Sequence, residues 1–199
     1  MFSAATSANA DLIFKVVVSG PYSAGKTTFI STVAGQSLVT TDEDVTAAIE
    51  AERKSATTVG MDFGVFVVPD EAGDIELRLH GTPGQERFRF MWEILAEGAD
   101  AFVIMLDGRT PHEWAEARSH ITTLRGVQDA PGVIAVNWYS EGDIVDRVRE
   151  EFSDTGFAVV ACDAREPGDV LGALVEVLTT TLERLEAETV SMAGAVEWH

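Results

Sequence analysis

The stretch Gly20-Pro21-Tyr22-Ser23-Ala24-Gly25-Lys26-Thr27 decides the fold, because it matches the pattern G-x-x-x-x-G-K-[ST] at the point where a predicted strand gives way to a predicted helix. Residues 12–19 before it include Val16-Val17-Val18, a run that suits a strand buried on both faces. Residues 26–34 are predicted to form a helix that stops at Gly35. Glycines in such a turn let successive backbone N–H groups point at an anion, so the sequence predicts a phosphate-binding loop.

Seven residues of this loop are predicted to bind a nucleotide. Lys26 is expected to place a positive charge on the β- and γ-phosphates, and the Thr27 hydroxyl is expected to ligate Mg²⁺. A chance glycine turn is the competing interpretation, and the agreement of strand, loop and helix weighs against it. The predicted nucleotide contacts of the loop are Gly20, Ser23, Ala24, Gly25, Lys26, Thr27 and Thr28.

Along the rest of the chain, apolar runs of strand length alternate with helical periodicity, which is typical of an α/β domain with a mostly parallel sheet. We expect six strands and about five helices, with one antiparallel pair where residues 59–69 and 75–80 form a hairpin. A long acidic connection at 36–57 precedes this hairpin and has room for a short helix at 45–54; loops of this length tend to be functional. The remaining predicted strands are 101–106, 133–136 and 157–161, and the remaining helices are 87–97, 112–124, 143–152 and 169–187.

The composition fits one globular domain, because 46% of the 199 residues are hydrophobic. We expect this domain to span residues 11–190, between a flexible tail at 1–10 and a second tail at 191–199. A formal net charge of −19 opposes electrostatic binding to nucleic acid or to an anionic membrane surface, so local geometry must hold any phosphate. The single cysteine, Cys162, together with the lack of a secretion signal or a membrane-span-length apolar run, predicts a cytoplasmic protein without integral membrane association.

Two further segments resemble a known family. Residues 58–63, Thr-Val-Gly-Met-Asp-Phe, and residues 81–88, Gly-Thr-Pro-Gly-Gln-Glu-Arg-Phe, resemble the switch I and switch II sequences of Ras-like small GTPases. The resemblance covers residues 12–187 and implies a Ras-like G domain with a P-loop. Because switch II reads Pro-Gly-Gln and lacks its usual aspartate, the chain is most similar to MglA-type bacterial GTPases and to small GTPases of actinobacterial operons that also encode a roadblock-domain protein.

This resemblance implies roles for several residues. Thr58, with Thr57 as the alternative register, would close on Mg²⁺ and the γ-phosphate, although both also suit an ordinary strand start. Gly84 would donate its backbone N–H to the γ-phosphate, and Gln85, otherwise a solvated loop residue, would orient the attacking water. Arg53 is the candidate catalytic arginine, moved into place by a roadblock-domain regulator; the competing interpretation is a solvated or paired side chain. An output effector is also expected.

The sequence departs from the family pattern at the metal site. Gly81 stands where the family has an aspartate that holds a water bound to Mg²⁺. The neighbouring His80 would point to the opposite face of a regular strand. Asp62 and Asp107 lie near strand ends and are candidate replacements, with structural hydrogen bonding as the alternative for each. With Asp62 or Asp107 as a candidate replacement, Mg²⁺ and GTP or GDP remain the expected cofactors.

The loops that would read the base depart from the pattern as well. Asn137 is retained from the family sequence Asn-Lys-x-Asp, but Trp138 replaces the lysine and Ser140 replaces the carboxylate that accepts the guanine protons. Trp138 is expected to stack on the base, and Glu141 or Asp143 could supply the missing acceptor.

The last base loop, Asp163-Ala164-Arg165, stands where the family has Ser-Ala-Lys. We expect the Ala164 N–H to donate to the guanine oxygen and Arg165 to cover the ring, and the alternative is an ordinary strand-to-helix loop. All three residues are predicted nucleotide contacts.

The leading hypothesis is a small GTP-binding switch that hydrolyses GTP slowly, with stimulation by a partner. Gly81 and Ser140 motivate one alternative, a nucleotide-binding pseudo-GTPase scaffold with negligible hydrolysis. A second alternative is a P-loop ATPase with altered base specificity. The apolar cluster after Gln85 is either a partner surface or part of the core. It consists of Phe88, Phe90, Met91 and Trp92.

Overall fold

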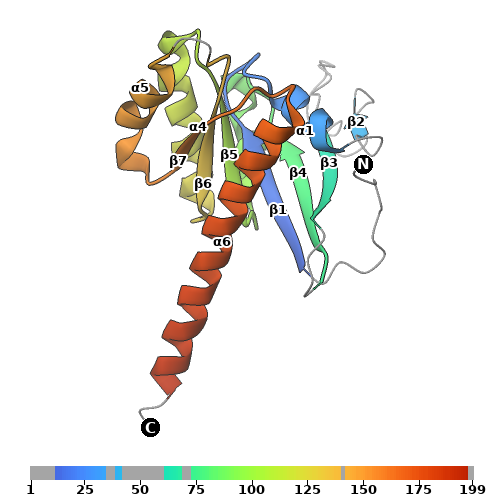
Figure 1. Ribbon diagram of the computed structural model, residues 1–199, viewed down its shortest axis with the longest axis vertical. Coiled ribbons are helices and arrows are strands. Elements are labelled where there is room, and N and C mark those ends of the chain that lie inside the picture. Colours follow the sequence, from blue (N-terminus) through green and yellow to red (C-terminus); the bar gives the residue numbers. More distant parts are fainter. Residues whose placement is uncertain (1–11, 35–38, 42–60, 69–72, 140–141, 197–199) are drawn as a thin grey trace.

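The computed structural model describes residues 12–34, 39–41, 61–68, 73–139 and 142–196, whose strands form one seven-stranded sheet in the order β2-β3-β4-β1-β5-β6-β7 (Figure 1). Strand β1 pairs in parallel with β4 and β5, and β6 and β7 continue the parallel part. Strands β2 and β3 add an antiparallel edge to β4. The strands are β1 (Leu12–Ser19), β2 (Val39–Thr41), β3 (Met61–Val68), β4 (Ile75–Gly81), β5 (Ala101–Asp107), β6 (Gly132–Asn137) and β7 (Ala158–Ala161).

Within the described ranges, five α-helices cover the two faces of this sheet. Helices α1 and α6 pack on one face, and α3, α4 and α5 pack on the other. Short 3-10 turns at Glu86–Phe88, Pro111–Glu113 and Ser153–Thr155 join some of these elements. The helices are α1 (Lys26–Ala34), α3 (Arg89–Ala96), α4 (Trp114–Val127), α5 (Ile144–Glu151) and α6 (Pro167–Val196).

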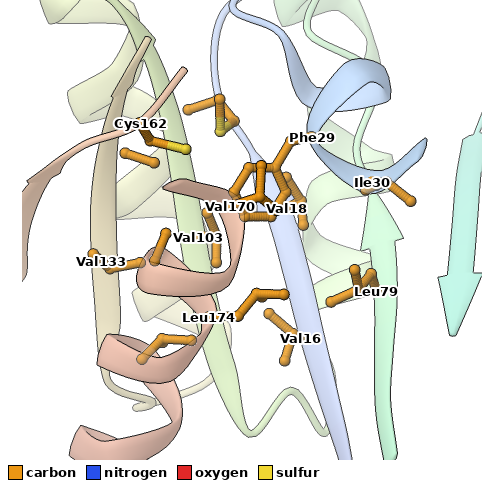
Figure 2. Packing of buried hydrophobic residues seen from close by; sticks show 14 of the residues in the cluster. Val16, Val18, Phe29, Ile30, Leu79, Val103, Val133, Cys162, Val170 and Leu174 are labelled. Atoms are coloured by element: carbon orange, nitrogen blue, oxygen red, sulfur yellow. The ribbon is translucent and has the colours of Figure 1, made fainter. Parts of the chain in front are cut away.

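The core divides at β1 because successive side chains of a strand point to opposite faces. Val16 and Val18 belong to the hydrophobic cluster under α1 and α6, whereas Val17 belongs to the cluster under α3, α4 and α5. All three valines are at most 1% exposed, which accounts for the uninterrupted valine run. Figure 2 shows the first cluster, with Val16, Val18, Phe29, Ile30, Leu79, Val103, Val133, Cys162, Val170 and Leu174 labelled.

The predicted fold class, a mostly parallel α/β sheet with five helices, is confirmed, and three details differ. The sheet has a seventh strand, β2, which lies inside the segment predicted as a connection; three residues without apolar alternation give no strand signal. The first turn after Gln85 is a 3-10 turn, so α3 begins at Arg89 rather than at residue 87. Helix α6 runs through Val196, past the helix end predicted at residue 187, and its last part extends beyond the sheet (Figure 1).

The parallel strands end at one edge of the sheet, and this edge positions the candidate site. The carboxyl ends of β1, β4, β5, β6 and β7 point the same way, so the loops that follow them gather there. In the described part of the chain, no helix combines the length and the apolar character that crossing a membrane requires.

Candidate functional site

The loop between β1 and α1 has the backbone of a phosphate cradle. Gly20, Ser23 and Gly25 all have positive φ angles, 136°, 64° and 105°, so the chain turns sharply between strand and helix. Only glycine fits at position 25, because an added Cβ would lie 2.5 Å from the side-chain nitrogen of Asn137. The loop leads directly into the N-terminus of α1, where free N–H groups and the helix dipole favour an anion.

Lys26 at the start of α1 is buried and folded back over this loop. Its Nζ donates hydrogen bonds to the carbonyl oxygens of Gly20 at 2.8 Å and Pro21 at 2.7 Å. Burial lowers the pKa of Lys26 to about 8, and the carboxylates of Asp62 and Glu116 act in the opposite direction. The ammonium group therefore remains charged at neutral pH and is fixed beside the cradle.

The predicted switch II segment begins against the same loop. A Cβ on Gly84 would lie 2.6 Å from the backbone nitrogen of Tyr22 and 2.8 Å from Nζ of Lys26, so only glycine can approach this closely. Gln85, the predicted catalytic residue, is half-buried and stands at the start of the 3-10 turn. Gly84 thus lies against the phosphate loop with Gln85 next to it in sequence, and the roles expected for both residues stay predictions.

A carboxylate lies where the family aspartate is missing. The Thr27 hydroxyl donates to Asp62 Oδ2 at 2.5 Å, and Asp62 comes from the neighbouring strand β3. A Cβ on Gly81 would meet Asp62 Cβ at 3.0 Å and Asp62 Oδ2 at 3.3 Å. Asp62 therefore occupies the space that a side chain at position 81 would fill. Hydroxyl and carboxylate oxygens suit Mg²⁺, which commonly takes few protein ligands besides phosphate oxygens and water.

The other candidate carboxylate has a structural role. Asp107 at the end of β5 accepts hydrogen bonds from Arg109 Nε at 3.0 Å, from Arg109 Nη2 at 2.7 Å and from the Arg109 backbone N–H at 2.9 Å. Its acceptor sites are therefore engaged with the following turn. Across the described ranges, no cluster of three or more His, Cys, Asp or Glu side chains is suited to a metal ion, so a metal here would depend on phosphate oxygens as well.

Asn137 ties the phosphate loop to the two base loops. Its Nδ2 donates to the Ala24 carbonyl at 3.2 Å, and its Oδ1 accepts from the backbone N–H groups of Trp138 at 3.0 Å and Ala164 at 3.3 Å. The side chain is 3% exposed, so these hydrogen bonds are shielded from water. The Ala164 N–H, expected to reach a guanine oxygen, lies at this junction and is directed to Asn137.

The base loops carry an arginine–tryptophan cluster. Guanidinium carbons of Arg109 and Arg165 lie 4.1 and 4.6 Å from the centre of a Trp138 ring, within range of cation–π attraction. Trp138 has a φ of 54°, a left-handed conformation that costs about 1–2 kcal/mol for a residue with a side chain. Sequence reasoning missed Arg109, which lies 29 positions before Trp138 and meets it only through the β5–β6 pairing.

Asp163 and Arg165 form an ion pair on the rim of these loops. Asp163 accepts hydrogen bonds from Arg165 Nε at 2.9 Å and Nη2 at 2.6 Å, and these bonds lower the pKa of Asp163 to about 2. The Asp163 backbone N–H donates to Asp169 Oδ2 at 2.9 Å, which also accepts from the Tyr139 hydroxyl at 3.0 Å. Asp169 near the start of α6 thus joins the two base loops.

A buried polar network lies behind switch II, and sequence reasoning did not find it. Ser19 Oγ is 2.8 Å from Thr82 Oγ1 and 2.8 Å from His120 Nδ1. The His120 ring stacks on Trp92 with centroids 3.5 Å apart, and Trp92 Nε1 donates to the Pro83 carbonyl at 2.6 Å. Burial and the charge of Lys26 lower the pKa of His120 to about 3, so its ring is neutral.

The apolar cluster after Gln85 divides between core and surface. Met91 and Trp92 are buried, Phe88 is half-buried and Phe90 is 47% exposed, with Ile94 also exposed one turn further along α3. The core interpretation therefore holds for Met91 and Trp92, and the partner-surface interpretation stays a prediction for the exposed Phe90.

Several predicted site residues lie outside the described residues. They are Thr57, Thr58, Arg53, Ser140 and Glu141, together with the helix expected at 45–54. Asp143, the other candidate acceptor for the base, is exposed just before α5.

Comparison with known proteins gives consistent matches. The family model described as Roc, "Ras of Complex, Roc, domain of DAPkinase", matches residues 15–138. Rab-3C of Bos taurus is 34% identical over 99 residues, which cover 50% of this chain and 38% of Rab-3C. Human Rab-3D is 31% identical over 117 residues, which cover 59% of this chain and 48% of Rab-3D. The chain spans less than half the length of these two relatives.

A relative of similar length comes from an archaeon. The uncharacterized protein MJ1339 of Methanocaldococcus jannaschii is 28% identical over 157 residues, which cover 77% of this chain and 88% of that protein.

Proposed function

This chain belongs to the Roc/Ras-like GTPase family, and we propose that it is a small GTP-binding protein that acts as a GTP/GDP-dependent molecular switch. The observation that carries the proposal is the contact of Gly84 with the phosphate loop, where its neighbours are Tyr22 and Lys26. A switch needs a backbone donor at the position of the γ-phosphate, because only that phosphate distinguishes the two nucleotide states.

Each part of the site has a role in this proposal. The cradle and the charged Lys26 bind the β- and γ-phosphates, and Asn137 holds the cradle and the base loops in register. Mg²⁺, when bound, neutralises charge on the phosphate oxygens. Thr27 and Thr58 would hold the metal directly, and the Asp62 carboxylate would hold its water in place of a residue at position 81.

We further propose that the protein hydrolyses GTP slowly and that a partner stimulates the reaction. Gln85 begins an exposed turn and is held less firmly than Gly84, which suits a water-positioning residue that needs to be ordered from outside. The resemblance of switch II to MglA-type sequences makes a roadblock-domain protein the proposed regulator, with Arg53 as the arginine that it would move into place. The effector would bind the exposed surface around Phe90 and Ile94.

One observation favours a second candidate, a nucleotide-binding scaffold with negligible hydrolysis. The Thr27 hydroxyl donates to Asp62, and the carboxylate comes from β3 rather than from switch II, so metal binding is not mechanically linked to that segment. The two candidates differ in turnover and not in binding. Single-turnover hydrolysis of bound GTP, with and without a roadblock-domain partner, separates them.

The experiment that tests the leading proposal is a competition titration of nucleotide-free protein with GDP, GTP, ADP and ATP, each with and without Mg²⁺. We expect a guanine preference of about 100-fold, or about 2.7 kcal/mol, and tighter binding with Mg²⁺. Equal affinities, or a preference for adenine, would contradict the proposal and favour an ATPase with a repurposed base loop.

A further inference from the structure

The peptide between Pro83 and Gly84 is oriented by a hydrogen bond from an indole to its carbonyl oxygen. Trp92 Nε1 donates to the Pro83 carbonyl at 2.6 Å, and the Trp92 side chain is fully buried. No peptide bond among the described residues is cis, so the C=O and N–H of this planar unit point in opposite directions. The Gly84 N–H is therefore directed away from Trp92.

The phosphate loop lies next to Gly84. Gly84 is so close to the loop that a Cβ would lie 2.6 Å from Tyr22 N and 2.8 Å from Lys26 Nζ. A donor fixed beside the amino group of Lys26 adds to its field at the same point, where a terminal phosphate carries the most negative charge. The indole thus orients a peptide whose other end borders the anion site.

The orientation of Trp92 is itself fixed. Its ring stacks on His120 at 3.5 Å with an interplanar angle of 27°, and His120 Nδ1 is 2.8 Å from Ser19 Oγ. Ser19 also contacts the Thr82 hydroxyl at 2.8 Å, so the residue before Pro83 is held by the same network. Ser19, Trp92 and His120 are all 0% exposed, and a neutral His120 ring adds no competing charge beside Lys26.

We propose that Trp92 is a positioning residue that aims the Gly84 N–H at the γ-phosphate and thereby makes the protein prefer nucleoside triphosphates over diphosphates. The inference rests on the proposed function, because it assigns a γ-phosphate to the space beside Gly84. Trp92 contacts no nucleotide in this account. It acts through the Pro83–Gly84 peptide, and Ser19 and His120 keep it in place.

The test is Trp92→Phe, which keeps an aromatic ring against His120 and removes the donor. Affinities for GDP and for the imido analogue of GTP are measured by competition with Mg²⁺, and the corresponding adenine pair is measured in parallel. We expect about a tenfold loss of affinity for the triphosphate analogue and less than a twofold loss for the diphosphate, because a freed peptide must be reoriented before it can donate.

Trp114→Phe is the matched control. The Trp114 indole nitrogen is buried and has no hydrogen-bond partner among the described residues, so the same substitution there removes no donor–acceptor pair. We expect its triphosphate-to-diphosphate ratio to equal that of the wild type. Ser19→Ala removes the hydrogen bond to His120 and leaves Trp92 itself unchanged, so it should lower the triphosphate-to-diphosphate affinity ratio by a smaller factor. It is the test variant if Trp92→Phe does not fold.

The outcomes separate this inference from the proposed function. An unchanged ratio in folded Trp92→Phe, or equal losses for both nucleotides, would overturn the role of Trp92 while leaving a guanine preference intact. An adenine preference in the wild type would contradict the proposed function, and the ratio of ATP analogue to ADP would still decide the role of Trp92. A wild type that binds neither purine would overturn both.

Discussion

Moving the carboxylate from position 62 to position 81 should reveal whether the two positions serve one site. In Gly81→Asp, the new side chain enters space that Asp62 already occupies, with Cβ 3.0 Å from Asp62 Cβ and 3.3 Å from Asp62 Oδ2. In the double variant Asp62→Ala/Gly81→Asp, the carboxylate at position 62 is gone, whereas the contacts of the new Cβ with the Cβ at position 62 and with Ile30 Cδ1, both 3.0 Å, remain. We expect the single variant to be less stable than the double variant, because only the single variant holds two carboxylates side by side.

The expected magnitude follows from these distances. Two carboxylates about 4 Å apart repel by up to about 4 kcal/mol at an effective dielectric constant of 20. Contacts of 3.0 Å to Asp62 and to Ile30 Cδ1 add an overpacking cost of about 1–3 kcal/mol, part of which Ile30 can relieve by moving. Allowing for relaxation, we expect a loss of about 2–4 kcal/mol in Gly81→Asp and about 1–2 kcal/mol in the double variant, which keeps the overpacking cost and loses the charge repulsion.

The assay is urea unfolding of the nucleotide-free proteins, together with the Mg²⁺ concentration needed to retain bound GDP. Asp62→Ala should raise that concentration about tenfold, and adding Gly81→Asp should lower it again. Glu150→Ala, which removes one negative charge from the exposed face of α5, controls for net charge. Additive effects of the two substitutions, with a coupling energy below about 0.5 kcal/mol, would refute the idea that Asp62 stands in for the missing aspartate.

The remaining predictions concern the buried polar side chains of the site and their hydrogen bonds. Lys26→Ala should abolish nucleotide binding, whereas Lys15→Ala, which removes a lysine bonded to the Glu97 carbonyl, should leave the affinity measured by titration unchanged. Asn137→Ala should lower the free energy of unfolding in urea by about 2–3 kcal/mol and also weaken nucleotide binding. Its control is Thr123→Ala, which removes a buried hydrogen bond within α4 and should lower stability without changing nucleotide binding. The pKa of His120 is about 3 in the folded protein and about 6.5 in the unfolded chain, so between these pH values only the unfolded chain binds the extra proton. The free energy of unfolding therefore falls as the pH falls. Between pH 7.5 and pH 5, His120→Phe should lose about 2 kcal/mol less of its free energy of unfolding than the wild type loses.

The sequence predicts the phosphate loop well because its strand, turn and helix are contiguous. Gly20, Lys26 and Thr27 need no knowledge of distant residues to be assigned, because the motif that predicts their roles is local. The same reasoning could not choose between Asp62 and Asp107. That choice depends on the β3–β4 register, in which Phe63 pairs with His80, so that Asp62 faces Gly81 on the same side of the sheet.

The network behind switch II depends on packing that a linear pattern does not encode. His120 falls at helical spacing among Ala117, Ile121 and Leu124, which are buried, and this spacing is the one available signal that it is a core histidine. Its stacking partner Trp92 lies 28 residues earlier on another helix, so the contact depends on how α3 and α4 pack. Arg109 over Trp138 is a second case of the same kind.

The buried hydrogen bonds and contacts of residues 82–84 also indicate where a γ-phosphate could change the structure. Thr82, Pro83 and Gly84 are all buried. The Thr82 hydroxyl is hydrogen-bonded to Ser19, the Pro83 carbonyl accepts a hydrogen bond from Trp92, and Gly84 contacts the phosphate loop. From Gln85 to Phe90 the side chains are half-buried or exposed, and local stability falls where buried hydrogen bonds and contacts end. A nucleotide-dependent rearrangement of switch II would therefore have its fixed end at Gly84. Gln85 is the first residue free to respond, which is where a residue that orients water needs to be.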